Sequence, residues 1–373
     1  MKRFFIFLSV LFLVGLSGFT AAANSYDELL KDRNAGEVLN SLPDSAKSTL
    51  KDIGIESFDF NKLNDLSFKS VYDVLLNTAS AQSKTPLKTF SAIIAVLLLY
   101  SVLYGVKTTL EGTLQPVLSL SVTLCISCAL LIPLSSFITS VVDVLKVSSD
   151  FMIAYVPLMV FAMGLSGQPV SGGAYYAVMI FTGQAVGNIS SKIIAPFMKI
   201  LLAVSISSSI SPNVNLSGIV RFISKFTKVL LVFSMSIFTG ILSIKQVVSM
   251  GADSISSRAV RLSLSSFVPI VGSALSEAYR TVQGSVGLLK SGIGIISLIA
   301  LAAVYLPVIL QCLFWMLSLG FAKSVGEVLN LREPCALLES VYSVVSTLLA
   351  IILSFSLIFI ISTAIVLLIG GGG

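Results

Sequence analysis

The cysteines are the residues whose spacing most resembles a chemical site. Cys125 and Cys128 form a Cys-x-x-Cys pair, a spacing typical of thiol redox centres and of zinc sites. Zinc would require further cysteine or histidine ligands, but the chain contains no histidine and no second pair of this kind. We therefore interpret Cys125, Cys128, Cys312 and Cys335 as small polarisable side chains that pack between helices, and we expect no bound metal or cofactor.

A second polar set lies in the segment 253–290, which is too polar to cross lipid as one helix. Its sequence predicts two amphipathic helices around a break at Phe267–Gly272, and Glu277 and Arg280 are spaced for an i, i+3 pair. Such a pair of helices is typical of a hairpin at the membrane interface. The alternatives are a hairpin that lines a polar cavity between subunits and a peripheral soluble loop.

The segment supplies the candidate functional residues, which we expect to act in assembly or as a polar lining rather than in catalysis. The alternative is that these charges only anchor helices at the level of the lipid headgroups. The candidates are Arg258, Arg261, Pro269, Gly272, Glu277, Arg280 and Lys290.

The apolar stretches hold few groups that an enzyme or an ion-coupled carrier would use. A carrier usually keeps acids near the membrane midplane, and the sequence places no Asp or Glu in such a position. Lys199 is the one candidate intramembrane charge, and it lies close to Lys192 and Pro196. Paired intramembrane acids and a Gly-rich phosphate loop are also missing from the sequence. We expect a protein that is not an enzyme.

The elements that position these residues belong to a mostly apolar chain. Hydrophobic residues make up 55% of it and charged residues 11%, against about 25% charged residues in a soluble domain. Residues 24–88 carry 18 of the 42 charged residues. We therefore predict an all-α fold, a polytopic helical membrane bundle over 89–373 behind a small water-facing region at 24–88. The basic residues are thinly scattered, which argues against binding of nucleic acid.

Residues 1–23 have the pattern of a cleavable signal peptide. Lys2 and Arg3 precede an apolar run from Phe4 to Val14, and small residues end it at Ala21-Ala22-Ala23. Cleavage there would leave the mature amino terminus outside the cytoplasm.

The region 24–88 predicts short helices. Pro43-Asp44-Ser45 indicates a turn and N-cap before a helix over Ala46–Ile53, which Gly54 ends, and Ser67–Ala79 has its apolar residues on one helical face. Two interpretations stay open for this extracytoplasmic region: a partner-binding tail, or a solvated spacer.

A helix needs about 20 apolar residues to cross a bilayer, and the chain offers seven or eight such stretches. Lys192 and Lys199 interrupt the fourth and fifth stretches, and Pro196 would kink or end a helix, so they are two spans or one span with a re-entrant piece. The candidates are Phe90–Val106, Gln115–Val142, Phe151–Leu165, Ala174–Ile189, Ile193–Ile210, Val229–Ile244, Ile293–Leu319 and Tyr342–Ile369.

Loop charge tests the orientation only in part. With the mature amino terminus outside and eight spans, Arg221, Lys225 and Lys228 fall in the cytoplasm, as the excess of positive charge inside favours. Arg258, Arg261, Arg280 and Lys290 would lie outside, against that rule. Either the number of spans between 174 and 210 differs from two, or the region 253–290 is held by packing rather than by charge.

Glycines suggest a point of close helix approach. Gly183-x-x-x-Gly187 fits the small-residue pattern of paired membrane helices. It predicts helix packing, either inside the bundle or at a subunit contact.

The segment 253–294 also resembles a known family. The residues Arg258-x-x-Arg261, Phe267-x-Pro269-x-Val271-Gly272, Thr281-Val282 and Leu288-Leu289-Lys290 before Gly292 and Gly294 are similar to the most recognisable block of the stage III sporulation protein AE family. The order of signal, modest extracytoplasmic region and long hydrophobic body agrees with that family.

The resemblance implies a function that the residues alone do not. Proteins of this family are membrane subunits of a transenvelope, channel-like and secretion-like complex between mother cell and forespore. They lie in the mother-cell membrane around the engulfed forespore, with other membrane proteins of the complex as partners and a separate companion as ATPase. The resemblance therefore implies a non-enzymatic subunit, and it leaves open whether the chain forms a homo-oligomer. The alternative from the residues is a stand-alone solute permease or passive transporter.

Overall fold

The structure is a computed structural model that describes residues 35–55, 67–106, 114–210, 217–267 and 272–369. The predicted signal peptide, the beginning of the 24–88 region and Pro269 lie outside these residues. Every regular element within the described ranges is helical, as the sequence predicts. The elements are α3 (Ala35–Asn40), α4 (Asp44–Asp52), α5 (Phe68–Val106), α6 (Leu114–Leu165), α7 (Pro169–Ile189), the π-helix η3 (Ser190–Ile194), α8 (Ala195–Ile210), α9 (Ser217–Phe267), α10 (Gly272–Val328) and α11 (Arg332–Ile369).

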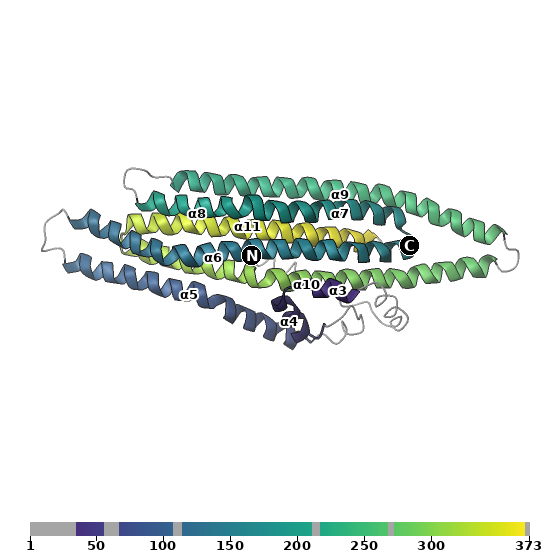
Figure 1. Ribbon diagram of the computed structural model, residues 1–373, viewed down its shortest axis with the longest axis horizontal. Helices are drawn as coiled ribbons and strands as arrows, with labels where there is room; N and C mark the ends of the chain where they lie inside the picture. Colours follow the sequence, from purple (N-terminus) through teal and green to yellow (C-terminus); the bar gives the residue numbers. More distant parts are fainter. Residues whose placement is uncertain (1–34, 56–66, 107–113, 211–216, 268–271, 370–373) are drawn as a thin grey trace.

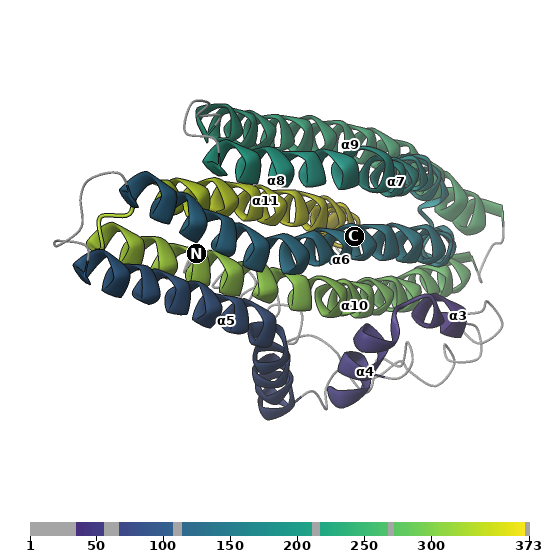
Figure 2. The same ribbon diagram turned by 60° about the vertical axis from the view of Figure 1, so that its left-hand side comes forward.

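Long antiparallel helices run along one axis and form three layers (Figure 1). In Figure 2, α9 lies with α7 and α8 in one layer, α11 with α6 in the middle, and α10 with α5 in the third. Contacts agree with this order, since α11 touches α10, α9, α8 and α6. The core is therefore centred on α11, α6 and α10, and α9 lies at an edge.

The described residues contain six helices that are long and apolar enough to cross a membrane, so the expected count of seven or eight spans is not confirmed. Two of the predicted stretches lie in α6, because Asp143, Lys146 and Asp150 between them are exposed and do not interrupt the helix. Two more lie in one continuous path through α7, η3 and α8.

The path through η3 explains why Pro196 does not end the third span. Proline lacks an N–H and its ring clashes with the carbonyl four residues earlier, but the first turn of a helix tolerates it. Pro196 is the second residue of α8, directly after the wider π-turn that begins at Ser190. The segment is therefore one span without a re-entrant piece.

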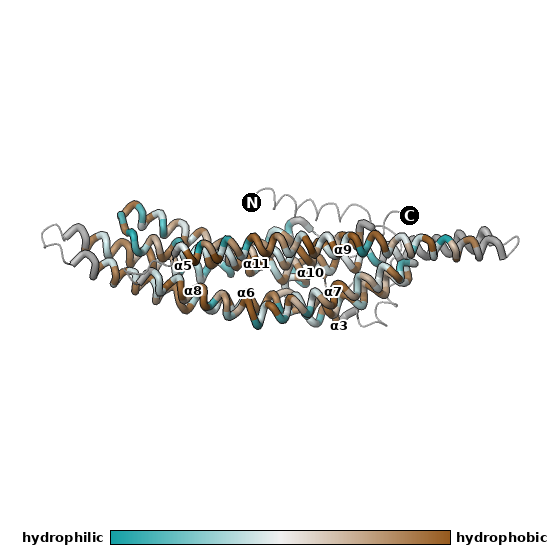
Figure 3. Tube along the Cα trace, turned by 90° about the horizontal axis from the view of Figure 1, so that it is seen from above, coloured by the Kyte–Doolittle hydropathy of each residue, from teal (hydrophilic) through white to brown (hydrophobic). Residues whose placement is uncertain are grey.

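The spanning helices are much longer than a bilayer is thick. At about 1.5 Å per residue, the 52 residues of α6 extend roughly 78 Å, against about 30 Å for the hydrocarbon core. The ends of the bundle must therefore project from the lipid unless the helices tilt strongly. Figure 3 shows that apolar residues nevertheless run along most of the bundle.

The predicted water-facing region is only partly separate from the bundle. The helix predicted at Ala46–Ile53 is present as α4, and Gly54 follows it with a φ of 88°, a conformation that suits glycine. The helix predicted at Ser67–Ala79 is the beginning of α5, which continues to Val106 without a break. The expected boundary between residues 88 and 89 thus falls inside one helix, which Figure 2 shows to be bent and which contains Pro86.

The bundle has two distinct ends. At the left of Figure 1, α5, α8 and α10 end and α6, α9 and α11 begin; we call this the α10–α11 end. At the right, α6 and α9 end and α7 and α10 begin; we call this the α6–α7 end. At this end, the last part of α9 and the first part of α10 extend beyond the other helices.

Candidate functional site: polar contacts at the two ends of the bundle

At the α6–α7 end, Asp253 of α9 holds the beginning of α7. Its Oδ1 accepts a hydrogen bond from the Val170 N–H at 2.9 Å, and its Oδ2 accepts one from the Ser171 N–H at 2.8 Å. The first N–H groups of a helix have no partner within that helix, and they carry partial positive charge. Asp253 is 3% exposed, so these two bonds compensate the cost of burying its charge.

A side chain of α10 also contacts the turn between α6 and α7. The Lys290 Nζ donates to the Gln168 Oε1 at 3.1 Å, and Lys290 is buried. Ser257 of α9 donates to the carbonyl of Gly167, whose φ of 77° is accessible to glycine. Three helices therefore meet at this turn through polar side chains, which are effective links where lipid surrounds the helices.

Beyond this turn, α9 and α10 project from the bundle (Figure 1). We call residues 258–267 of α9 and 272–289 of α10 the projecting hairpin. The sequence correctly predicted a helix on either side of the break. It predicted an interfacial hairpin, but the two helices continue the spans along the bundle axis instead of forming separate elements across it. The reason is that backbone hydrogen bonding continues through the polar stretch without a breaking residue.

The structure distributes the candidate residues over this hairpin and its base. Arg258 is exposed on α9, Lys290 is buried at the base, and Pro269 lies outside the described residues. The others fall within helices, and their side chains are not among those described: Arg261 on α9, and Gly272, Glu277 and Arg280 on α10.

Gly183 and Gly187 face α6. A Cβ at Gly183 would lie 3.0 Å from the Ile153 Cγ1, and one at Gly187 would lie 2.9 Å from the Ser149 Oγ. The Ser149 hydroxyl donates to the Gly183 carbonyl. Both glycines therefore serve a close approach of α7 to α6 within this chain.

The expected packing of the cysteines is wrong for the Cys-x-x-Cys pair. Cys125 and Cys128 are exposed on α6, whereas Cys312 is buried in α10 and Cys335 is partly buried. Apolar neighbours along the sequence do not distinguish the inner from the outer face of a membrane helix, because lipid also favours apolar residues. Within the described ranges, no group of three or more Cys, Asp or Glu side chains is placed to hold a metal ion.

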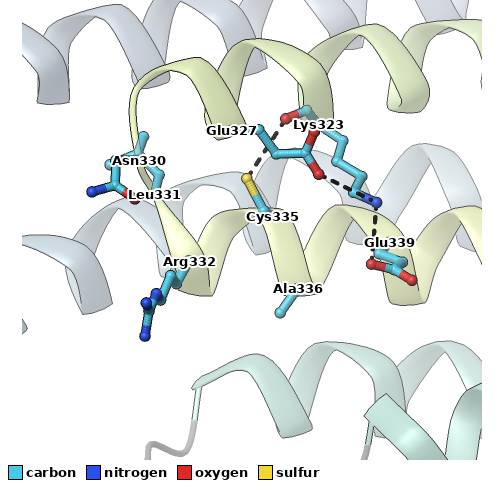
Figure 4. A pocket seen from close by; sticks show the side chains of 8 residues that line it. All are labelled: Lys323, Glu327, Asn330, Leu331, Arg332, Cys335, Ala336 and Glu339. Carbon is cyan, nitrogen blue, oxygen red and sulfur yellow. Dashed lines mark hydrogen bonds and ion pairs between the residues drawn. The ribbon is translucent and has the colours of Figure 1, made fainter.

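The α10–α11 end carries a pocket of about 310 Å³ at the turn between the two helices. Figure 4 shows the Lys323 amine between two carboxylates. The Lys323 Nζ lies 3.5 Å from the Glu327 Oε1 and 3.2 Å from the Glu339 Oε2. Glu339 also pairs with Arg221 of α9 at 3.3 Å. Lys323, Glu327, Glu339 and Arg221 thus pair with one another and join α9, α10 and α11.

Two further polar contacts hold the same end. The Ser119 Oγ of α6 donates to the Glu333 Oε2 of α11 at 2.6 Å. The Lys228 Nζ of α9 donates to the Ser346 Oγ of α11 at 2.8 Å. The chemistry of both ends is that of ion pairs and hydrogen bonds between helices.

Sequence reasoning missed several of these residues. It selected Lys199 as the intramembrane charge, but Lys199 is exposed on α8, while the buried Lys290 and the bonded Lys228 also lie in spanning helices. It treated Asp253 only as the start of a polar segment. The available signal was that Asp253 is the one acid on a helix rich in bases and apolar residues.

These features define the chain as a polytopic, all-helical membrane protein in which polar side chains join the helices at both ends. Within that class it belongs to the stage III sporulation protein AE family, whose family profile it matches over residues 55–370. It is 22% identical over 338 residues to the stage III sporulation protein AE of Bacillus subtilis (strain 168), with 82% of each chain covered. No solved structure matches the chain. The family is one of sporulation membrane proteins.

Proposed function

We propose that the chain is a non-enzymatic membrane subunit of the transenvelope channel between mother cell and forespore. It lies in the mother-cell membrane that surrounds the forespore, with its mature amino terminus outside the cytoplasm. The observation that carries the proposal is the family match over residues 55–370. The network of Lys323, Glu327, Glu339 and Arg221 supports a structural role, because its charges are engaged in holding helices together.

The projecting hairpin supplies the surface through which this subunit meets other membrane proteins of the complex. It extends past the α6–α7 turn, and its base is fixed by Asp253 and Lys290. Arg258 is exposed near that base. An exposed guanidinium on a rigid helix is suited to pair with carboxylates of a neighbouring chain.

The orientation of the bundle fits this role. If α5 enters from outside, the α10–α11 end faces the cytoplasm and the projecting hairpin faces outward. The segment after α9 lies on the same side of the membrane with six spans as with eight. Arg258 and Arg261 therefore remain outside, although basic residues are favoured in cytoplasmic loops. The buried contacts of Asp253 and Lys290 are the packing that offsets this bias.

Deletion and complementation test the proposal. Loss of the chain is expected to block sporulation after engulfment while vegetative growth stays normal. Complementation with Arg258→Ala/Arg261→Ala is expected to restore membrane insertion but not full sporulation. Lys245→Ala removes an exposed base from the same helix outside the hairpin and serves as the matched control. A growth defect without a spore defect would contradict the proposal, and normal sporulation of the double variant would assign the hairpin a scaffolding role only.

A solute permease acting alone is the second candidate. The observation that favours it is the polar inward face of α9, with Gln246, Ser249 and Asp253 buried against the bundle. Uptake of a defined solute into liposomes that contain the purified chain would support it, and absence of uptake would leave the subunit role.

A further inference from the structure

We propose that a polar outer face formed by α6, α7, η3 and α8 is the contact between two copies of this chain, in which Asp143 of each copy pairs with Lys192 of the other. The inference goes beyond the proposed function and does not depend on it. Its tests measure association in membranes rather than sporulation, so the two proposals can fail separately.

The first observation is a row of exposed polar side chains on each of two neighbouring helical paths. Figure 3 shows α6, α7 and α8 along the same side of the bundle. The side chains of each row follow one another at helical spacing, so each row occupies one outward stripe. We call the two rows together the polar face. Its residues are Ser136, Ser140, Asp143, Lys146 and Asp150 on α6, and Gln184, Asn188, Lys192 and Lys199 on α7, η3 and α8.

The second observation is that the charges of the polar face are not paired within the chain. Asp143, Lys146, Asp150, Lys192 and Lys199 form no ion pair with any other described residue. The neutral side chains of the face differ, since they bond to their own helices: the Ser140 hydroxyl donates to the Ser136 carbonyl, and the Asn188 amide donates to the Gln184 carbonyl. The charges are therefore available to a partner outside the chain.

The polar face lies level with an apolar outer stretch of α9. Asp253 of α9 binds the Ser171 N–H at the beginning of α7, and the two helices run in opposite directions. Lys192 lies 21 residues beyond Ser171, and the same count back from Asp253 reaches Val232, which is 63% exposed. Residues 229–244 of α9 carry no charge, so this level of the bundle suits lipid. Charges there rarely face lipid and usually pair with protein groups or meet water.

Asp143 and Lys192 lie at the same level of the polar face. Gly187 of α7 meets Ser149 of α6, since a Cβ on this glycine would lie 2.9 Å from the Ser149 Oγ. Asp143 precedes Ser149 by six residues, and Lys192 follows Gly187 by five. Because α6 and α7 run in opposite directions, both residues lie on the same side of this contact, at roughly 9 Å and roughly 8 Å from it along the bundle.

This equality of level makes the polar face complementary to itself. Two copies in one membrane have the same orientation, so a two-fold axis between them runs across the membrane and along the helices, and rotation about it keeps every residue at its level. An axis in front of the junction of α6 and η3 places α6 of each copy against η3 of the other. Asp143 then meets Lys192 twice, once on either side of the axis. Opposite charges attract strongly once they are removed from water, which is why a second copy fits this face.

Disulfide formation between copies tests this arrangement. Two full-length chains, one of them with an added tag and both with the four native cysteines replaced by alanine, are produced together in one membrane. One chain carries Asp143→Cys and the other Lys192→Cys, and we expect oxidation to link them. Two chains that carry Phe233→Cys, next to Val232 on the outer face of α9, are the control. Linkage no greater than in this control overturns the proposal and is the result expected if water or a different protein covers the face. Equal linkage between two Asp143→Cys chains also overturns it, because the axis places Asp143 opposite Lys192.

Charge exchange tests the pairing itself. Asp143→Lys and Lys192→Asp each place like charges opposite one another, so each is expected to weaken association of the chains at least about tenfold. The double variant Asp143→Lys/Lys192→Asp restores opposite charges and is expected to associate like the unaltered chain. Lys245→Asp, at an exposed position on α9, is the control without effect. Both Asp143 and Lys192 are exposed in the single chain, so the fold of each copy is expected to stay intact.

Fluorescence energy transfer between labelled chains, measured as the chains are diluted in liposomes, reports their association. Two outcomes overturn the proposal: an unaltered chain that stays monomeric, or a double variant that associates no better than the single variants.

Discussion

Two helices that are both long and apolar enough to cross a membrane, α9 and the more apolar α11, are used in opposite ways. Over its most apolar 18-residue window, α11 is 56% buried and α9 is 6% buried. The few residues that α9 buries fully are mainly polar, namely Val220, Ser224, Leu242, Gln246, Ser249 and Asp253. Its large apolar side chains, such as Phe226, Phe233 and Val248, point away from the bundle.

The difference shows what holds each helix in a membrane. Lipid is as apolar as a leucine side chain, so burial of apolar surface contributes little to helix association. The centre of the bundle is held by close packing around α11, whose Thr347, Ser356 and Ser362 hydroxyls bond to their own helix. The edge helix α9 is held by polar contacts to its neighbours, through Arg221, Lys228 and Asp253.

The largest expected effect comes from deleting the same side chain on each helix. Phe359 of α11 is fully buried, and Phe233 of α9 is 62% exposed. Phe359→Ala is expected to lower the free energy of unfolding by about 3 kcal/mol through lost packing, whereas Phe233→Ala changes it by less than about 0.5 kcal/mol. Equilibrium unfolding in mixed micelles measures both. Equal effects would remove the distinction between core and edge.

A smaller effect is expected from changing Asp253, the α9 side chain that caps the beginning of α7. Asp253→Asn replaces one acceptor by an amide donor facing a backbone N–H, so it is expected to destabilise the protein by about 2 kcal/mol. Asp143→Asn, at an exposed position on α6, is the control with no expected change. Limited proteolysis within α9 provides the second measurement, because release of the cap should expose this helix before α11. Unchanged cleavage would mean that α9 is held by other contacts.

The smallest effect is expected at the opposite end of α9. Glu339 pairs with Lys323 and Arg221 and so joins three helices, but it is 41% exposed. Glu339→Gln is expected to cost about 0.5 kcal/mol. Glu327→Gln, which removes a pair within α10 alone, is expected to cost less. Raised salt should abolish the difference between the two variants, since exposed ion pairs are screened, and a difference that persists at high salt would contradict this account.

Much of the fold is determined by the sequence through local rules. The apolar stretches predict spanning helices because the backbone must satisfy its own hydrogen bonds in lipid. The helix at Ala46–Ile53 was predicted from turn residues, and so were two separate helices that end at Phe267 and begin at Gly272. The family resemblance also rests on residue types and their spacing, which are properties of the sequence alone.

Predictions from the sequence were wrong where lipid and the protein interior favour the same residue types. Cys125 and Cys128 sit among apolar residues that fit either the core or the lipid face, and the structure places both cysteines on the exposed face. The charged residues between 143 and 150 suggested a boundary between spans, but they form one exposed side of a continuous α6. Hydropathy reports the cost of contact with water, so it does not distinguish lipid from protein interior.

A bundle of apolar helices with a polar segment near residue 260 could be predicted from the residues alone, since helix formation and insertion follow from the residues of each stretch. The inward polar face of α9, and the contacts of Asp253 and Lys290 with the α6–α7 region, become visible only in the folded bundle. Those contacts join residues 82 to 122 positions apart. Their partners are therefore set by the packing of whole helices, which no local pattern encodes.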